Sequence, residues 1–497
     1  MTRWSREQFH AHPGNSPPFS NQVKPLDPKL LGVLWEDFDS REERLRQVIG
    51  ERLGEQPAPQ IDDHLVATYF FAFRHQTLVE GAREISYHAT SGIRNPPPGS
   101  LLEACTGRLA GADPFDTTGR IGLLHMAYPL KMLLQPDGHL TSTDVFHTVA
   151  GAIIFDVCEN LDARLVAVQM PEGVIRTFPG PAHGPAGLRN LTAFGPGRPA
   201  FGTILKPTAG IVPEEVGALV GEAATCPLFM FVKEDENLYP RLDYSPVRER
   251  TRQAVLAIER ANDKRGGLGL IFAPHITGTP GEILESAHAA VEAGAAGLMF
   301  SETFAGGTVR MVREAFRARR TPPALYGHNA GIGSRTRAIW REVIDWFARL
   351  DGIDFRQTAP LLPGAPFLKP SGREWEASEA VLSRAVPGIK PTMVVRAGGL
   401  DQGNIGLNLA DAESRGMTSN ILFLAGSSIN SIKNSHGKAD PRYGAEAMLQ
   451  ALEVHRSGDL RHVPKERHAA ELLNLAERRN LGALRAALEQ RYGHTHA

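Results

Sequence analysis

The second half of the chain repeats one pattern, a short apolar run that is closed by a polar residue or glycine and followed by a helix-length segment. The pattern occurs eight times, at 201–206, 229–236, 268–275, 295–302, 323–329, 352–357, 392–399 and 420–427. Most of the intervening segments are amphipathic, as in GEILESAHAAVEAG. Eight strands that alternate with helices indicate a (β/α)8 barrel. We predict this barrel for residues 196–464.

The rest of the chain divides by composition. Residues 1–62 are polar and proline-rich, with one charged helical run at 40–53, and are expected to form an N-terminal arm without a core of its own. Between 63 and 195, strand-like runs alternate with helical patterns, which predicts a compact α+β domain. Residues 465–497 are expected to form a C-terminal helical extension.

Composition excludes several classes of protein. The 497 residues carry 54 Lys+Arg and 55 Asp+Glu, so no basic surface for nucleic acid is expected. No apolar stretch reaches the roughly 18 residues of a membrane helix, and the first residues lack the apolar centre of a signal peptide, so we expect a cytoplasmic protein without a membrane partner. The three cysteines are far apart, which predicts reduced thiols and no disulfide framework.

The ends of the predicted strands supply the candidate site residues. In a (β/α)8 barrel the active site lies at the carboxyl ends of the strands. The residues that close the eight runs are Lys206, Lys233, Asp235, Glu236, His275, Ser301, Glu302, His328, Asn329, Arg356, Gln357, Gly398, Gly399, Gly426 and Ser427.

The segment from Lys233 to Glu236 is the centre of the predicted chemistry. On a strand, Lys233 and Asp235 point to the same face, and the turn that follows can bring Glu236 beside them. Oxygen ligands of this kind suit Mg²⁺. Because an amine is not an oxygen ligand, the set would need a carbamate on Lys233. The alternative is a solvated charge run at a strand end.

The other candidates also have two interpretations. Lys206 could act in acid–base catalysis or extend its amine from the barrel rim into solvent. His275 and His328, taken singly, are more often rim or core histidines than catalysts. Glycines at 398–399 and the Gly426-Ser427-Ser428 turn follow the last two strands, where barrels commonly bind phosphate through backbone N–H groups.

Three segments together resemble motifs of the RuBisCO large-chain family, most closely its non-carboxylating RuBisCO-like members. FPGPAHG (178–184) is similar to the linker that enters the barrel, GTILKPTAG (202–210) to the first-strand Lys-Pro motif, and FVKEDEN (231–237) to the activation motif. The resemblance extends over about 63 to 460. It implies an α/β architecture, with a ferredoxin-like α+β domain followed by a TIM barrel. It also implies a homodimer, because the partner subunit completes each site in this family.

Residue by residue, the resemblance implies a Mg²⁺ cofactor held by carbamylated Lys233 together with Asp235 and Glu236. Lys206 would handle the enolisation proton, and His328 would line the site. The loops that bind the first phosphate of a small phosphorylated substrate would contain Gly398, Gly399, Gly426 and Ser427.

Departures from the family pattern argue against carboxylation of ribulose bisphosphate. After the sixth barrel strand the chain reads TAPLLPGAPFLKP, with no lysine before Lys369 where carboxylases have a mobile lysine loop. Family residues are also replaced at two groups of positions. In the first-strand motif and the N-terminal domain these are Thr208, His88 and Asp144, and at the second phosphate site they are Asn329, Arg356 and Ala397.

What remains predicts a Mg²⁺-dependent enzyme that enolises a phosphorylated keto-sugar or 3-keto sugar acid, as a decarboxylase or isomerase. Arg356, with Arg94 and Arg396, could bind a substrate carboxylate bidentately. One alternative is an enolase or isomerase of methylthio-sugar phosphates. Another is a non-catalytic metabolite-binding protein, against which the joint presence of Lys206, Lys233, Asp235 and Glu236 argues.

Overall fold

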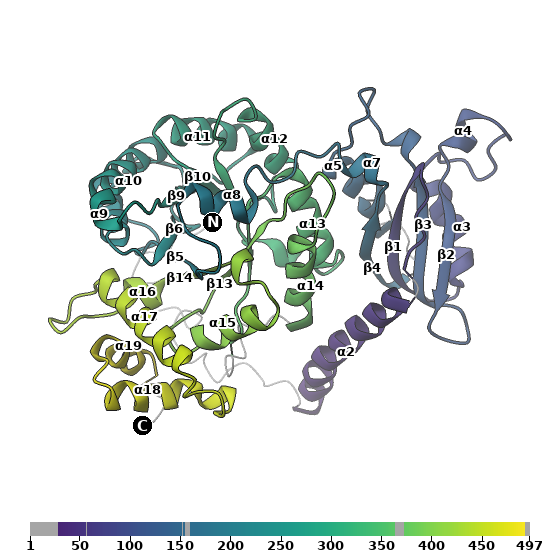
Figure 1. Ribbon diagram of the computed structural model, residues 1–497. Helices are drawn as coiled ribbons and strands as arrows, with labels where there is room; N and C mark the ends of the chain where they lie inside the picture. Colours follow the sequence, from purple (N-terminus) through teal and green to yellow (C-terminus); the bar gives the residue numbers. More distant parts are fainter. Residues whose placement is uncertain (1–27, 56, 152, 155–159, 363–371, 493–497) are drawn as a thin grey trace, which may run out of the picture. The chain divides into compact units, whose positions relative to one another are not determined.

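The computed structural model describes residues 28–55, 57–151, 153–154, 160–362 and 372–492 (Figure 1). The chain forms two compact units, Met1–Pro57 and Ala58–Ala497. The first contains the helix α2 (Pro28–Glu55). This helix includes the charged run predicted at 40–53 and is longer than predicted.

The second unit begins with a four-stranded antiparallel sheet. Its strands are β1 (His64–Phe73), β2 (Arg108–Pro114), β3 (Ile121–Pro129) and β4 (Asn160–Gln169), in the order β2-β3-β1-β4. Helix α3 (Leu78–His88) and the short helix α4 (Leu101–Ala104) connect β1 to β2, and α5 (Ser142–Phe146) with the π-helical segment η3 (His147–Gly151) lies between β3 and β4. This connectivity and strand order are ferredoxin-like, as predicted. The end of the helix predicted over 142–158 lies partly outside the described residues.

Eight parallel strands form the barrel, one in each of the eight predicted runs. They are β5 (Ala200–Ile204), β6 (Phe229–Lys233), β9 (Ile271–Ala273), β10 (Gly297–Phe300), β11 (Ala324–Gly327), β12 (Phe355–Thr358), β13 (Met393–Ala397) and β14 (Ile421–Ala425). The hydrogen-bonded order runs from β10 through β14 to β5, β6 and β9. A bridge between His275 and Met299 brings β9 against β10 and closes the ring.

Helices cover the outside of this ring (Figure 1). The main ones are α9 (Pro213–Ala224), α10 (Val247–Ala261), α11 (Pro280–Glu292), α12 (Thr308–Ala315), α13 (Arg341–Asp351), α14 (Gly372–Ser383), α15 (Ile405–Ser414) and α17 (Pro441–Ser457). Helices α18 (His468–Arg478) and α19 (Gly482–Tyr492) pack with α17 through apolar side chains that include Leu472 and Leu484. Among the described residues, no helix combines the length and the apolar content that a membrane span requires. Cys105 and Cys226 are half-buried free thiols rather than core residues, and Cys158 lies outside the described residues.

The barrel strands divide their side chains between two cores. Phe231, Tyr326 and Phe355 belong to a cluster inside the barrel. Val232 belongs to a second cluster, between the strands and the helices. Because side chains alternate along a strand, each residue near a strand end faces either the barrel mouth or the helix layer.

Asp351, the last residue of α13, connects the barrel to the antiparallel-sheet domain. Its carboxylate accepts a hydrogen bond from the Ser142 hydroxyl at the start of α5. The side chain is buried, and its Oδ1 atom has no hydrogen-bond partner among the described residues. Burial, which disfavours the charged form, raises the pKa of Asp351 to about 7.

Replacing Asp351 by Asn should therefore stabilise the protein in a pH-dependent way. The raised pKa means that the neutral acid contributes stability that is fully present below about pH 4, falls as the pH rises towards 7 and is lost above it. Denaturant unfolding should show that the advantage of Asp351→Asn grows by on the order of 1 kcal/mol per pH unit in that window. The exposed Asp263→Asn is the control, and a pH-independent difference would contradict the assignment.

Candidate active site

Five of the predicted site residues lie together at the mouth of the barrel, in two contact groups. Lys206 and Asp235 both contribute to the charge environment of Lys233. The Lys206 amine lies 2.6 Å from Oδ2 of Asp235, and the Lys233 amine lies 3.9 Å from Oε2 of Glu236. Nε2 of His328 lies 3.3 Å from the same Glu236 oxygen. These side chains come from the ends of β5, β6 and β11, so the structure brings together residues that are far apart in the sequence.

Lys233 is the most unusual member of the cluster. Its side chain is fully buried at the end of β6, and its amine donates a 3.0 Å hydrogen bond to the carbonyl oxygen of Glu234. The amine lies 5.7 Å from the centre of the Tyr326 ring. Burial lowers the pKa of Lys233 to about 8, although the neighbouring carboxylates oppose the shift. The neutral amine, which is the form that reacts with CO₂, is therefore more accessible near neutral pH than it is for an ordinary lysine.

Asp235 and Glu236 lie on the turn that leaves β6. Asp235 is buried; its Oδ1 accepts hydrogen bonds from the backbone N–H and the side-chain amide of Asn237, while Oδ2 faces Lys206. Glu236 remains partly exposed to the mouth. Among the described residues, no three His, Cys, Asp or Glu side chains gather closely enough to hold a metal ion. The carboxylates of Asp235 and Glu236 suit Mg²⁺, and the predicted carbamate on Lys233 would add a third oxygen ligand.

His328 presents a hydrogen-bond donor to Glu236. The backbone N–H of Ala330 donates to Nδ1 of His328 at 3.1 Å. Burial lowers the pKa of His328 well below its usual value, so the ring is neutral. Since Nδ1 accepts, the single ring proton lies on Nε2, which faces the Glu236 carboxylate.

The predicted phosphate loops follow β13 and β14, and the loop after β14 lies beside Lys206. Gly398 and Gly399 both have positive φ angles, of 94° and 85°. Gly426 has φ and ψ angles of −101° each, and a Cβ atom there would lie 3.6 Å from Cε of Lys206. Packing within the chain therefore leaves room for a Cβ atom at 426. Ser427 is exposed at the start of the short helix α16 (Ser427–Asn430).

Several residues that were not predicted from the sequence hold these loops in place through hydrogen bonds. Asn404 donates to the carbonyl oxygen of Gly399 at 2.9 Å, and Asn430 donates to that of Gly426 at 3.0 Å. The hydroxyl of Tyr492, at the end of α19, donates to Asp401 at 2.9 Å. The C-terminal helices thus support the loop that carries Gly398 and Gly399. No local motif predicts these contacts, because the partners are distant in sequence or are common loop residues.

Arg356 faces away from the mouth. It is fully buried between β12 and α13, with its guanidinium paired to Asp345 at 2.6 Å and to Glu302. Burial opposes the charge, but these two carboxylates outweigh it and raise the pKa of Arg356. Asn329 also faces this network, since its Oδ1 accepts from Arg341 at 2.6 Å.

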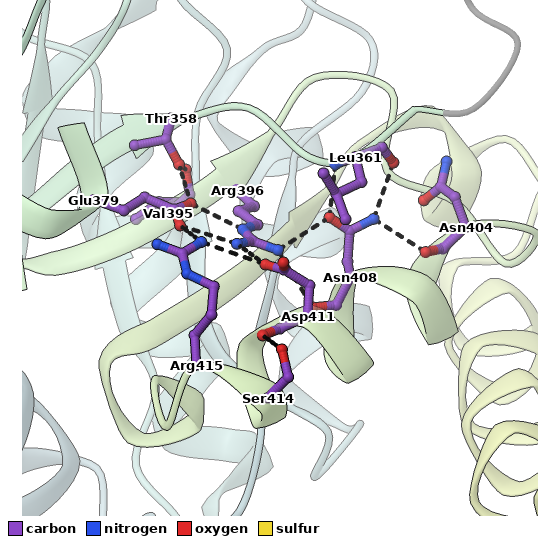
Figure 2. Close-up of polar contacts among 10 residues, drawn as sticks. All are labelled: Thr358, Leu361, Glu379, Val395, Arg396, Asn404, Asn408, Asp411, Ser414 and Arg415. Carbon is purple, nitrogen blue, oxygen red and sulfur yellow. Dashed lines mark hydrogen bonds and ion pairs between the residues drawn. The ribbon is translucent and has the colours of Figure 1, made fainter. Parts of the chain in front are cut away.

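Arg396 is held in the same way, by Glu379 at 2.9 Å and by Asp411 (Figure 2). Arg94 pairs with Glu84 at 2.9 Å in the antiparallel-sheet domain. All three predicted carboxylate-binding arginines are therefore already in ion pairs, and their role towards a substrate stays a prediction.

The remaining strand-end candidates occupy supporting positions. Gln357 accepts a 2.9 Å hydrogen bond from the Tyr326 hydroxyl inside the mouth. Ser301 is buried, and its backbone N–H donates to the Thr277 hydroxyl at 2.9 Å. His275 is buried beside the cluster at the end of β9.

A glycine at 327 makes room for the Arg356 ion pairs. A Cβ atom on Gly327 would lie 2.7 Å from Nη1 of Arg356, which two carboxylates hold in place. We expect Gly327→Ala to lower the free energy of unfolding by about 1–3 kcal/mol in urea denaturation. Gly333→Ala, where a Cβ would meet nothing within 4 Å, is the control and should cost much less. Equal losses for the two variants would contradict this role of Gly327.

Comparisons with known proteins agree with this barrel. Residues 188–362 match the family described as the ribulose bisphosphate carboxylase large chain, catalytic domain. An uncharacterized ribulose bisphosphate carboxylase-like protein of Bordetella bronchiseptica is 32% identical over 242 residues, which are 48% of this chain and 53% of that protein. A 3-oxo-isoapionate-4-phosphate decarboxylase of Rhizobium rhizogenes is 29% identical over 236 residues, 46% of this chain and 52% of that protein. The chain thus spans about half the length of these curated relatives.

A solved structure supports the fold over most of the chain. The octameric RuBisCO of Pyrococcus horikoshii matches with a TM-score of 0.72 at 21% identity, covering 87% of this chain and 94% of that one. At this identity the likeness shows the fold alone.

Proposed function

We propose that the chain is a non-carboxylating member of the RuBisCO large-chain family and that it decarboxylates a phosphorylated 3-keto sugar acid. The observation that carries this proposal is the gathering of Lys206, Asp235, Lys233, Glu236 and His328 at the barrel mouth, in two contact groups. The kinship with a 3-oxo-isoapionate-4-phosphate decarboxylase supports the choice of substrate class. The absence of a lysine before Lys369 in the segment after β12 argues against carboxylation.

We assign the metal site to the β6 end. Lys233, once carbamylated, would hold Mg²⁺ together with Asp235 and Glu236. When bound, Mg²⁺ would supply electrostatic stabilisation to the negative charge that develops on the substrate carbonyl oxygen. Lys233 is buried and has few competing hydrogen bonds, which favours its reaction with CO₂.

The chain's own residues would handle the proton. In a 3-keto acid the bond to the carboxylate carbon breaks, CO₂ leaves, and the electron pair moves into the neighbouring carbonyl group to give an enolate. The enolate carbon then needs a proton. The Lys206 amine is the candidate donor, because it lies at the mouth and is oriented by Asp235. The Nε2–H of His328 would orient the Glu236 carboxylate.

The phosphate would bind to backbone N–H groups of Gly398, Gly399, Gly426 and Ser427, on the side of the mouth where Lys206 lies. The predicted homodimer stays a proposal, since the octamer is a property of the matched Pyrococcus horikoshii protein. An isomerase would use the same Lys206 to remove a proton instead of adding one. A methylthio-sugar phosphate enzyme would share the metal site and differ in the rest of the pocket.

Incubating the protein with 3-oxo-isoapionate 4-phosphate, Mg²⁺ and bicarbonate in D₂O tests the proposal. We expect CO₂ release and one deuterium on the carbon that lost CO₂, both followed by NMR. Lys233→Ala should lose about 10³-fold or more in rate if the metal site carries the charge stabilisation. The exposed Lys131→Ala is the control.

Other results would change the assignment. Deuterium exchange without CO₂ release would favour the isomerase. Turnover that survives in Lys233→Ala would contradict the metal-carbamate site. Binding of the substrate without either reaction would favour the metabolite-binding protein.

Gly426→Ala tests the phosphate loop separately. Because the added methyl group meets no atom of the chain closer than 3.6 Å, we expect the variant to fold, and its melting temperature measures any cost of the backbone conformation at 426. A methyl group that crowds a bound phosphate should raise KM by about tenfold, roughly the loss of one hydrogen bond to a charged group. The control is Gly173→Ala, an exposed helical position with nothing within 4 Å. An unchanged KM for Gly426→Ala would place the phosphate elsewhere.

A further inference from the structure

His275 is buried at the barrel mouth, and one of its ring nitrogens has no partner. Only 1% of its surface is exposed, and Nε2 has no hydrogen-bond partner among the described residues. Leaving a buried acceptor unpaired costs about 1–3 kcal/mol, and folded proteins rarely do so. The mechanism above makes no use of this nitrogen.

The protonation state of the ring follows from its other contacts. Nδ1 of His275 lies 3.1 Å from the carbonyl oxygen of Leu238, which can only accept, so Nδ1 carries the proton. Burial lowers the pKa of His275 to about 4, so the ring is neutral. Nε2 therefore presents a lone pair and needs a donor.

The position of His275 places its side chain on the inner side of the barrel wall. Ile271 and Ala273 on β9 belong to the cluster inside the barrel, and the bridge from His275 to Met299 continues the same alternation. Its charge environment includes Lys233, Asp235 and Arg250. The ring also contributes to the charge environment of His328. His275 thus lies among the residues of the mouth, on the strand beside β6.

The backbone holds the ring in this orientation. The N–H of His275 donates to Oε2 of Glu234 at 2.8 Å, and the Tyr239 ring lies 5.6 Å away, centre to centre. Glu234 is in turn fixed by Arg250 at 2.7 Å. The ring cannot turn its Nε2 atom outward without breaking the bond to Leu238.

We propose that His275 is a further substrate-binding residue, whose Nε2 accepts a hydrogen bond from a hydroxyl group of the substrate. The two histidines of the mouth are then complementary, because His328 offers a donor and His275 an acceptor. A sugar-derived keto acid supplies such a hydroxyl group, whereas a carboxylate or phosphate oxygen cannot donate. This inference rests on the proposed function for its substrate class, and on the structure alone for the acceptor.

Two variants test whether the acceptor at the Nε2 position, rather than the fold around it, determines substrate binding. The variant His275→Asn can keep an amide N–H for the Leu238 carbonyl but places no acceptor at the Nε2 position. The variant His275→Gln can place an amide oxygen at the Nε2 position. With the decarboxylation substrate, we expect His275→Asn to raise KM by about tenfold to a hundredfold, and His275→Gln by much less. Equal effects of the two variants, or an unchanged KM in His275→Asn, would overturn the proposal.

A second measurement does not depend on turnover. In the full-length protein labelled with ¹⁵N-histidine, the Nε2 resonance of His275 is identified by its loss in His275→Asn. The probe is erythronate 4-phosphate, a hydroxylated sugar acid phosphate, added after Mg²⁺ and bicarbonate. We expect the resonance to move upfield on addition of the probe, as an unpaired acceptor gains a hydrogen bond.

The outcomes distinguish the two proposals. An upfield shift without CO₂ release from the keto acid would retain His275 as a hydroxyl acceptor and reject the decarboxylase. If Mg²⁺ and bicarbonate alone produce the full shift before the probe is added, the donor is bound water and the proposal is overturned. No shift at the highest probe concentration would overturn it as well.

Discussion

The buried ion pair between Glu234 and Arg250 is the contact on which the site depends. Glu234 lies between Lys233 and Asp235 and faces outward, where its carboxylate meets Arg250 of α10 at 2.7 Å, with both side chains fully buried. Arg250 also donates to the carbonyl oxygens of Tyr239, Leu238 and His275. One guanidinium therefore fixes the end of β6, the loop after it and the end of β9. Removing either partner would leave an unpaired buried charge, which costs about 3–5 kcal/mol.

Side chains alternate along each barrel strand, and this alternation decides the role of the residues at the other strand ends. Inward side chains build the mouth, and outward side chains form ion pairs with the helices, as Arg356 does with Asp345 and Arg396 with Glu379. An outward charge is fully removed from solvent, so a helix residue of opposite charge must accompany it. The result is a rigid layer behind the inward groups, which suits a site whose residues must keep fixed positions.

The alternation of side chains along a strand also decides how much of the site could be predicted from the sequence. The eight strands were predictable because each apolar run ends in a polar residue or glycine, and the mouth residues Lys206, Lys233 and His328 followed from their positions there. Arg356 faces outward because Phe355 and Gln357 on either side of it face inward, and only the structure shows which of the alternating residues face inward. The prediction took every residue that ends a strand as a site candidate, and so it did not separate inward from outward side chains. The partners of the outward charges, and the proton position on each histidine, depend on contacts across the fold that no local pattern encodes.

Charge balance at the mouth connects the buried lysine to the metal. With Lys233 neutral, Asp235 and Glu236 outnumber the Lys206 ammonium by one negative charge. A carbamate on Lys233 would add another, leaving an excess of two in a region where Asp235 and Lys233 are buried. That excess is the charge of one Mg²⁺ ion, so carbamate and metal would each stabilise the other and neither would be favourable alone. The neutral rings of His275 and His328 add hydrogen bonds without disturbing this balance, which is a physical reason for burying histidine rather than lysine at those two positions.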